Sequence, residues 1–447
     1  MIQDRKAARR WSASSLGCIV SGLGFHAAVL LALLALWILI GLPYGARRLR
    51  EAQRAWSETF LDPDHFRARY PDRPHSASAL RLDGLARGLG TFLAIRPGDY
   101  EPGTSHADTP SLKQLREFVS SVRKQGNDSP LRVPPAIAAF ANAQAPKLQE
   151  AEDVLLDDSP LDWKTGADGE FPVGLLGYRN VQELLLVRSL VADERGDRAA
   201  RDRALEASWR LEESLWRRPI LLEHLIANAG AGGRNACLRR FRQVPGAWTA
   251  RLRRPERLKS LVDAYQVEVL TACRSAERLM GLADADFLTG EPLPKVAPGR
   301  WVIRVGTAPL LRMAVAGYAD ALRTEVQALR QLDPCTIARE PYTERAKKAQ
   351  PHVNAVTQVS LPSMLGAWWG TRDILLDEEL TAGVLQVRPL MGSADAGAWR
   401  LASATCPSLT WSSTAGRQGE VVIRPVGEYE PGVGSGTPGL RYTITAP

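Results

Sequence analysis

The longest apolar run in the chain lies near its N-terminus. Residues 16–42 contain no Asp, Glu, Lys or Arg. A bilayer core of about 30 Å needs about 20 helical residues, so this run is long enough to cross a membrane. Trp11 and Tyr44 lie just outside its ends, where amphipathic rings favour the interface. We predict a cytoplasmic tail over residues 1–15 and a transmembrane anchor over residues 16–43, in contact with the lipid bilayer.

A cleaved signal peptide is the alternative explanation of this run. Its apolar region is shorter than 27 residues as a rule, and a small-residue cleavage site follows it. Here no such site precedes Gly45-Ala46-Arg47-Arg48. We therefore favour an uncleaved anchor.

A helix and then a proline-rich connector are expected over residues 44–110. Residues 47–60 contain neither Gly nor Pro, which predicts that the helix continues beyond the bilayer. Pro63, Pro71 and Pro74 end it. A leucine stripe over residues 76–93 then predicts another helix. Thr109-Pro110 is typical of a helix start, because the hydroxyl caps and proline suits the first position.

Residues 111–395 are predicted to form an α-helical domain. Apolar positions repeat with helical spacing over 175–193 and 198–216, and the turn Glu194–Asp197 separates them, which predicts an αα-hairpin. A third helix over 220–229 should end at the glycines 230–233. Further helices are expected at about 234–243, 255–282, 309–332 and 372–382. The hairpin is similar to one unit of a tetratricopeptide-like solenoid, but no 34-residue period recurs, so we prefer an irregular helical body.

Residues 396–447 differ from the rest in texture. Short alternating runs are separated by turns rich in Gly, Pro and Ser, which predicts three or four antiparallel strands. The expected runs are 399–402, 409–413, 420–426 and 440–445. The fold class is therefore mainly α, with an N-terminal transmembrane helix, an irregular or solenoid-like body of αα-hairpins, and a small C-terminal antiparallel β unit.

Positive charge is concentrated around the apolar run. The net charge is +8 at pH 7, and residues 1–60 contribute five of these charges. A duplex-binding surface needs several unopposed cations, whereas cations that flank one apolar segment indicate a membrane surface. We expect no nucleic acid as a partner.

Four basic residues lie on each side of the span, and long domains translocate largely regardless of charge. We predict that the bulk of the chain lies outside the cytoplasm.

No motif in the chain identifies a catalytic residue, a cofactor-binding site or a metal site. The six histidines form no ligand pair with one another or with cysteine. Glu223 and His224 are adjacent on a predicted helix, so they point about 100° apart and form no dyad. The acidic cluster Glu150, Glu152 and Asp153 is expected to lie on a solvated helix edge. Composition also gives no sign of a cofactor.

Four cysteines outside the anchor allow three pairings. In an oxidising compartment, a disulfide between Cys335 and Cys406 would join the helical part to the β unit. Cys237 and Cys273 lie on neighbouring predicted helices and are a second candidate pair. The spacing does not decide between these possibilities.

Four tryptophans are candidate interaction residues. Trp368 and Trp369 lie between Gly366 and Gly370, which suits an exposed aromatic platform for sugar or peptide, although such residues more often anchor a core. Trp209 and Trp216 are one heptad apart on a predicted helix.

RARYPDRPHSASALRLDGLARGLG (67–90) and ASWRLEESLWRRPILLEHLIA (207–227) resemble a group of uncharacterised bacterial proteins with one N-terminal membrane span and a helical body. The resemblance covers about residues 20–250 and implies no activity.

We consider two hypotheses about the function of this chain. The first is a membrane-anchored helical scaffold of the bacterial envelope, held in the cytoplasmic membrane and binding an unidentified protein. The second is an envelope enzyme that acts on peptide or glycan, with carboxylates and a histidine gathered in three dimensions, for example around His224.

Overall fold

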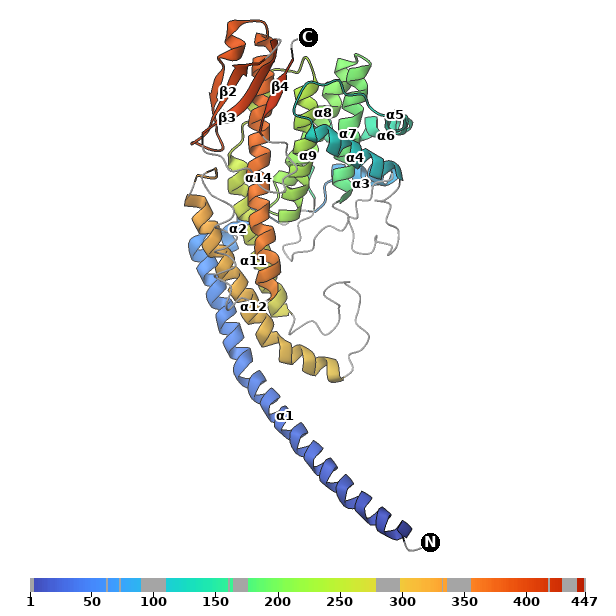
Figure 1. The fold of residues 1–447 in the computed structure, drawn as a ribbon, viewed down its shortest axis with the longest axis vertical. Helices are drawn as coiled ribbons and strands as arrows, with labels where there is room; N and C mark the ends of the chain where they lie inside the picture. Colours follow the sequence, from blue (N-terminus) through green and yellow to red (C-terminus); the bar gives the residue numbers. More distant parts are fainter. Residues whose placement is uncertain are drawn as a thin grey trace.

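A computed structural model describes residues 4–61, 63–71, 74–89, 110–159, 161–163, 176–278, 298–331, 333–335, 355–416, 419–427 and 440–445. Helices make up most of this chain, and a four-stranded sheet lies at its C-terminal end (Figure 1). The predicted mainly α class with a small antiparallel β unit is confirmed.

Helix α1 (Asp4–Thr59) includes the apolar run and the expected juxtamembrane helix in one element. In Figure 1 its N-terminal part projects alone from the body. Leu31, Leu36 and Leu39 are exposed, whereas Leu49 and Trp56 are buried. In the described part of the chain, α1 is the one helix long and apolar enough to cross a membrane.

Helix α1 contacts α12 (Pro298–Gln331) at the edge of the apolar run. A Cβ at Gly41 would lie 2.9 Å from the Cβ of Pro309, and one at Gly45 would lie 3.1 Å from the Pro309 carbonyl oxygen. Residues four apart share one helix face. The two glycines therefore let the two backbones approach, as small residues do between membrane helices.

The connector folds into two short helices, α2 (Pro63–Arg69) and α3 (Ala77–Gly88). The Ser76 side chain caps α3 by accepting a hydrogen bond from the Ala79 N–H. Leu93 and Thr109 lie outside the described residues. Helix α4 (Pro110–Lys124) begins at the expected proline.

The body contains the predicted hairpin and several helices around it. Helices α7 (Leu176–Glu194) and α8 (Arg198–Trp216) match the expected pair, and Gly196 has φ +75° in their turn. The other helices are α5 (Pro135–Ala143), α6 (Ala145–Leu156), α9 (Leu221–Arg240), α10 (Ala247–Arg251), α11 (Glu256–Arg278) and α14 (Ala355–Val387). Helix α14 is three times as long as expected, because residues 371–384 are buried on all sides and so give no amphipathic pattern to mark the ends of the helix.

The expected end of a helix at glycines 230–233 is wrong. Helix α9 continues through them to Arg240. A Cβ at Gly232 would lie 2.8 Å from the Arg123 guanidinium, and one at Gly233 would lie 2.7 Å from Leu186. A Cβ at Gly230 would overlap the Gln182 amide. These glycines serve close packing against α4 and α7 rather than helix termination.

The sheet is an antiparallel meander of β1 (Arg400–Ala402), β2 (Thr410–Ala415), β3 (Val421–Val426) and β4 (Tyr442–Ile444). The short 3₁₀ helices η2 (Arg388–Leu390) and η3 (Ala394–Gly397) lead into it. Trp411, Ile423 and Tyr442 share one hydrophobic cluster with Leu376 and Leu380 of α14. The sheet is therefore built onto the end of α14.

Replacing Gly230 by Leu should destabilise the protein by about 1–3 kcal/mol or more, because the side chain overlaps Gln182 in a filled interior. The matched control is Gly84→Leu in α3, where no heavy atom lies within 4 Å of an added Cβ. The control should be neutral or stabilising by up to about 1 kcal/mol, from helix propensity alone. Thermal unfolding of the purified full chain checks both, and equal melting temperatures for the two variants would contradict the packing role.

Candidate functional site

Three consecutive carboxylates on α14, Asp377, Glu378 and Glu379, are buried at the centre of the body. Successive residues on a helix point about 100° apart, so the three side chains face three different neighbours. Burying a carboxylate is costly unless it is paired and hydrogen-bonded. Each of the three has found such partners.

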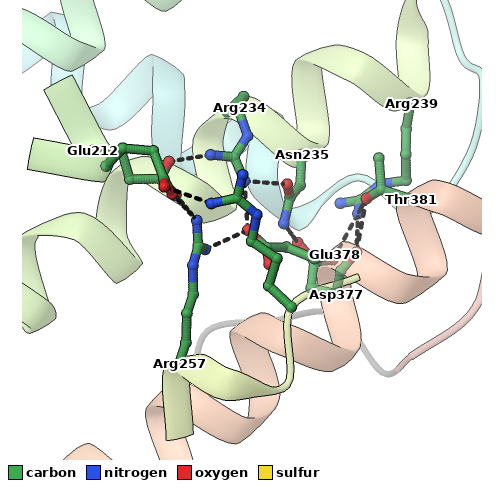
Figure 2. A network of polar contacts seen from close by, with 10 residues as sticks. Glu212, Arg234, Asn235, Arg239, Arg257, Asp377, Glu378 and Thr381 are labelled. Atoms are coloured by element: carbon green, nitrogen blue, oxygen red, sulfur yellow. Dashed lines mark hydrogen bonds and ion pairs between the residues drawn. The ribbon is translucent and has the colours of Figure 1, made fainter. Parts of the chain in front are cut away.

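Glu378 lies in a buried ion cluster (Figure 2). Its Oε1 accepts hydrogen bonds from Arg234 Nη2 at 2.6 Å and from Arg257 Nη1 at 2.8 Å. Both arginines also pair with Glu212 of α8, Arg257 at 3.2 Å. Arg257 also pairs with Glu213 at 2.6 Å, and Glu213 pairs with Arg254. Three cations therefore meet three anions, and the cluster joins α8, α9, α11 and α14 without net charge.

Asp377 and Glu379 extend the network in opposite directions. Asp377 accepts hydrogen bonds from Arg239 at 2.6 Å and from Asn235 at 2.9 Å, both on α9. Glu379 accepts hydrogen bonds from the backbone N–H of Thr405 at 2.7 Å and from the Trp411 indole at 2.7 Å. The first carboxylate fixes α14 to α9, and the second fixes it to the sheet.

The electrostatics of the cluster indicate that it stabilises the packing of the helices and is not a proton-transfer site. Burial raises the pKa of Glu212, although the positive charges of Arg234 and Arg257 act to lower it. Burial lowers the pKa of Arg257, but Glu378 and Glu212 outweigh it and hold that pKa above its ordinary value. The guanidinium carbons of Arg234 and Arg257 also lie 4.5 Å and 5.3 Å from the centre of the Trp209 ring. Such stacking adds cation–π attraction.

A second buried cluster surrounds His224. Its Nε2 lies 2.7 Å from the Arg218 carbonyl oxygen, and Arg218 pairs with Glu223 at 2.7 Å. Burial raises the pKa of Glu223 to about 7 and lowers that of His224 to about 4. The two side chains form no dyad, as expected. Both are fully buried, so a substrate in solution does not reach them.

The structure joins Cys335 and Cys406 in a disulfide with a Cα–Cα distance of 5.6 Å. This bond links the segment after α12 to the loop before β2. The other expected pair is wrong: Cys237 and Cys273 are buried in two different hydrophobic clusters and form no disulfide with each other. Asp333 lies close to Cys335 and Cys406, a combination of residues that could bind a metal ion. The two cysteines are bonded to each other, however, and so do not offer thiolates to a metal.

All four candidate interaction tryptophans are buried. Trp209, Trp216, Trp368 and Trp369 are each 3–6% exposed, so Trp368 and Trp369 form no exposed aromatic platform and have the more frequent role of core residues. Trp209 packs edge-on against Trp248, and Trp216 lies against His224. The large rings fill space between helices. Trp368 alone of the four lines one of the two clefts described below.

The acidic cluster on α6 is only partly at a solvated edge. Glu152 is buried and pairs with Arg188 at 2.6 Å and Arg203 at 3.4 Å. Burial raises its pKa to about 7, against the two arginines. The network residues of α14 were also missed. The sequence signal for these residues is the charged triplet 377–379, which lies between the apolar runs 374–376 and 382–385. Charged residues within an otherwise apolar stretch are typical of a buried helix.

Large clefts lined by described residues lie beside the α7–α8 turn and beside α11. The first, beside the α7–α8 turn, has a volume of about 560 Å³ and is lined by Asp193, Glu194, Arg201 and Arg240 among others. Its acids are occupied: Asp193 pairs with Arg201 at 2.9 Å, and Glu194 accepts the Val133 N–H at 2.6 Å. The second cleft has a volume of about 930 Å³ and lies beside α11. Neither is lined by Glu212, Glu378 or His224.

Three comparisons with known proteins found no similar sequence or structure. No family model matches the chain. No curated protein matches it. No solved structure matches it. The residues themselves therefore carry the functional argument.

Replacing Glu378 by Ala should cost about 3–5 kcal/mol of stability, because Arg234, Arg254 and Arg257 would then share only the two carboxylates of Glu212 and Glu213. The matched control is Glu117→Ala, an exposed glutamate of α4, which should change stability by less than about 0.5 kcal/mol. Chemical denaturation of the full chain measures both. Similar midpoints for the two variants would show that the network does not hold the body together.

Replacing Glu223 by Gln should make the protein sensitive to acid. Between pH 4.5 and 6.5 the folded protein holds a proton on Glu223, whereas the unfolded chain holds it on His224, so their effects on stability cancel. In the variant only His224 remains. The unfolded state then binds more protons, and stability should fall by roughly 1 kcal/mol per pH unit as pH drops from about 6.5 towards 4.

Melting temperatures at several pH values measure this effect. The His224→Gln variant is the opposite control, since Glu223 is then the one group of the pair that still titrates. Its stability should fall as pH rises from about 4.5 to 7. Parallel pH profiles for the wild type and both variants would contradict the assignment of these two protonation states.

Proposed function

We propose that this chain is a single-span protein of the bacterial cytoplasmic membrane whose body lies outside the cytoplasm and binds a partner protein. In this proposal it acts as a scaffold that holds the partner at a fixed height above the bilayer. The observation that carries the proposal is the continuity of α1, which runs unbroken from the apolar run into the core of the body.

A continuous helix transmits position from the membrane to the body. Leu49, Ala52 and Trp56 of α1 are buried in the same cluster as Tyr318 and Leu322 of α12. The Trp56 indole donates a hydrogen bond to the Ala319 carbonyl oxygen at 2.8 Å. The stretch from Gly45 to Thr59 rises by about 20 Å at 1.5 Å per residue. A flexible linker would fix neither height nor orientation, whereas this helix supports both.

The disulfide supports a location outside the cytoplasm. Cys335 and Cys406 are 71 positions apart and are joined in the body. Disulfides persist in oxidising compartments and are rare in the reducing cytosol. The equal basic counts on the two sides of the span do not oppose this orientation, because long domains translocate largely regardless of charge.

The arrangement of ionisable groups favours binding over catalysis. An active site needs titratable groups that converge on a space open to substrate. The buried carboxylates of the network are paired with arginines or, at Glu379, accept hydrogen bonds from backbone N–H groups and an indole, and His224 has no exposed surface. The alternative of an envelope enzyme centred on His224 therefore gains no support from the described residues.

The state of Cys335 and Cys406 in intact cells tests the proposed location. Cells are denatured in acid, and the chain is alkylated with a polyethylene glycol maleimide, with or without prior reduction. We expect reduction to add two labels to the wild type and none to the Cys335→Ser/Cys406→Ser variant. Labelling of the wild type that does not depend on reduction would place the body in a reducing compartment and contradict the proposal.

Crosslinking in intact cells tests the scaffold role. A tagged full chain is crosslinked, solubilised and purified beside an untagged chain, and the recovered proteins are quantified by mass spectrometry. We expect one protein, or a few, to be recovered in a fixed ratio to the tagged chain. Recovery no greater than from untagged cells would contradict a scaffold.

A further inference from the structure

The second cleft is a groove between the ends of α1 and α12 and the first turns of α11; we refer to it as the α11 groove. The C-terminal ends of α1 and α12 lie side by side there (Figure 1). Its volume is about 930 Å³. Its apolar lining includes Phe60, Leu258, Val262, Leu329 and Trp368. The groove is large enough for several side chains of another molecule.

The disulfide holds one wall of the groove. Asp333 and Pro334 precede Cys335, and Thr405 and Pro407 flank Cys406; all four line the groove. The Asp333 carboxylate accepts hydrogen bonds from the Cys335 N–H at 2.9 Å and from the Ser408 N–H at 3.0 Å. Its charge is therefore directed at the backbone of the wall.

The remaining charges give the rim a positive excess. Asp263 pairs with Arg69 at 3.3 Å and accepts a hydrogen bond from the Tyr70 hydroxyl at 2.6 Å. Lys259 and Arg330 are exposed, and neither forms an ion pair with any residue in the described ranges. The Arg330 guanidinium lies 5.5 Å from the Phe60 ring centre, so this cation stands next to the apolar floor.

We propose that the α11 groove binds an acidic segment of a partner protein. Apolar side chains of that segment pack on the floor, and its carboxylates pair with Lys259 and Arg330. The inference rests on the proposed scaffold function and names the chemistry of its partner. Two cations beside an apolar surface complement a segment that alternates acidic and apolar residues.

A protein segment fits this place better than a membrane lipid. The groove is lined by Thr59, Phe60 and Leu61, at the end of α1 farthest from the apolar run. It therefore lies about 20 Å beyond Gly45, counted at 1.5 Å per helical residue. A lipid that stays in the proposed bilayer does not reach it.

Peptide selection on the full chain in phosphatidylcholine nanodiscs tests the inference. A phage library of random twelve-residue peptides is selected against the wild type, and enriched peptides are synthesised for fluorescence anisotropy. We expect enriched sequences to contain more Asp and Glu than Lys and Arg, together with apolar residues. Failure to enrich any peptide, or enrichment of basic or uncharged ones, would overturn the assignment.

Matched variants then locate the binding site. The charge reversal Lys259→Glu/Arg330→Glu should weaken binding at least tenfold. Lys113→Glu, an exposed lysine of α4 that no described residue pairs with, should leave it within twofold. Ala404→Trp, which places a ring in the groove and keeps every charge, should also weaken binding. Unchanged affinity in both groove variants would overturn the inference.

Crosslinking with the same variants separates this inference from the proposed function. If the charge-reversal variant recovers the same partner as the wild type in equal amount, the groove is the wrong site and the scaffold stands. If neither recovers a partner, the scaffold itself is contradicted. A photocrosslinker at position 259 that captures only a second copy of this chain would also overturn the partner assigned here.

Discussion

The body of this protein depends on the pairing of three buried carboxylates on one helix. Asp377, Glu378 and Glu379 of α14 face three directions and fix α9, the α8–α11 pair and the sheet. In a low-dielectric interior a carboxylate or a guanidinium without its partner is strongly unfavourable. Helices that could slide past one another on an apolar surface are therefore held in one register, because each shift would separate a charge from its partner.

The rigidity of this body gives meaning to its continuity with the apolar helix. Trp56 and Leu49 fix α1 to α12, and α12 shares a core with Trp368 and Leu375 of α14. The charge network then connects α14 to the remaining helices. In the proposed membrane-anchored state, a position set by the bilayer passes through these packed helices to the groove beside α11. The disulfide adds a covalent tie at the far end of the same groove.

The outcome at individual elements shows which signals in the sequence are reliable. The hairpin of α7 and α8 was predictable because each helix has a periodic apolar face and Gly196 marks the turn. The glycines of α9 misled, since glycine is frequent both at helix ends and at close helix contacts. The tryptophans were ambiguous, because a large ring fills a core as readily as it lines a groove, and their burial agrees with the more frequent of the two roles.

The sequence by itself determined the membrane-length apolar helix, the mainly α class and a C-terminal unit of three or four short strands, because these follow from local composition and from periodicity along the chain. Only the tertiary structure decided which buried charges meet. Glu212 and Arg234 lie on the consecutive helices α8 and α9, whereas Glu378 lies on α14, 144 positions after Arg234, and no local pattern pairs the three residues. The same holds for the groove, whose cations Lys259 and Arg330 meet one apolar floor only after α11 and α12 have packed.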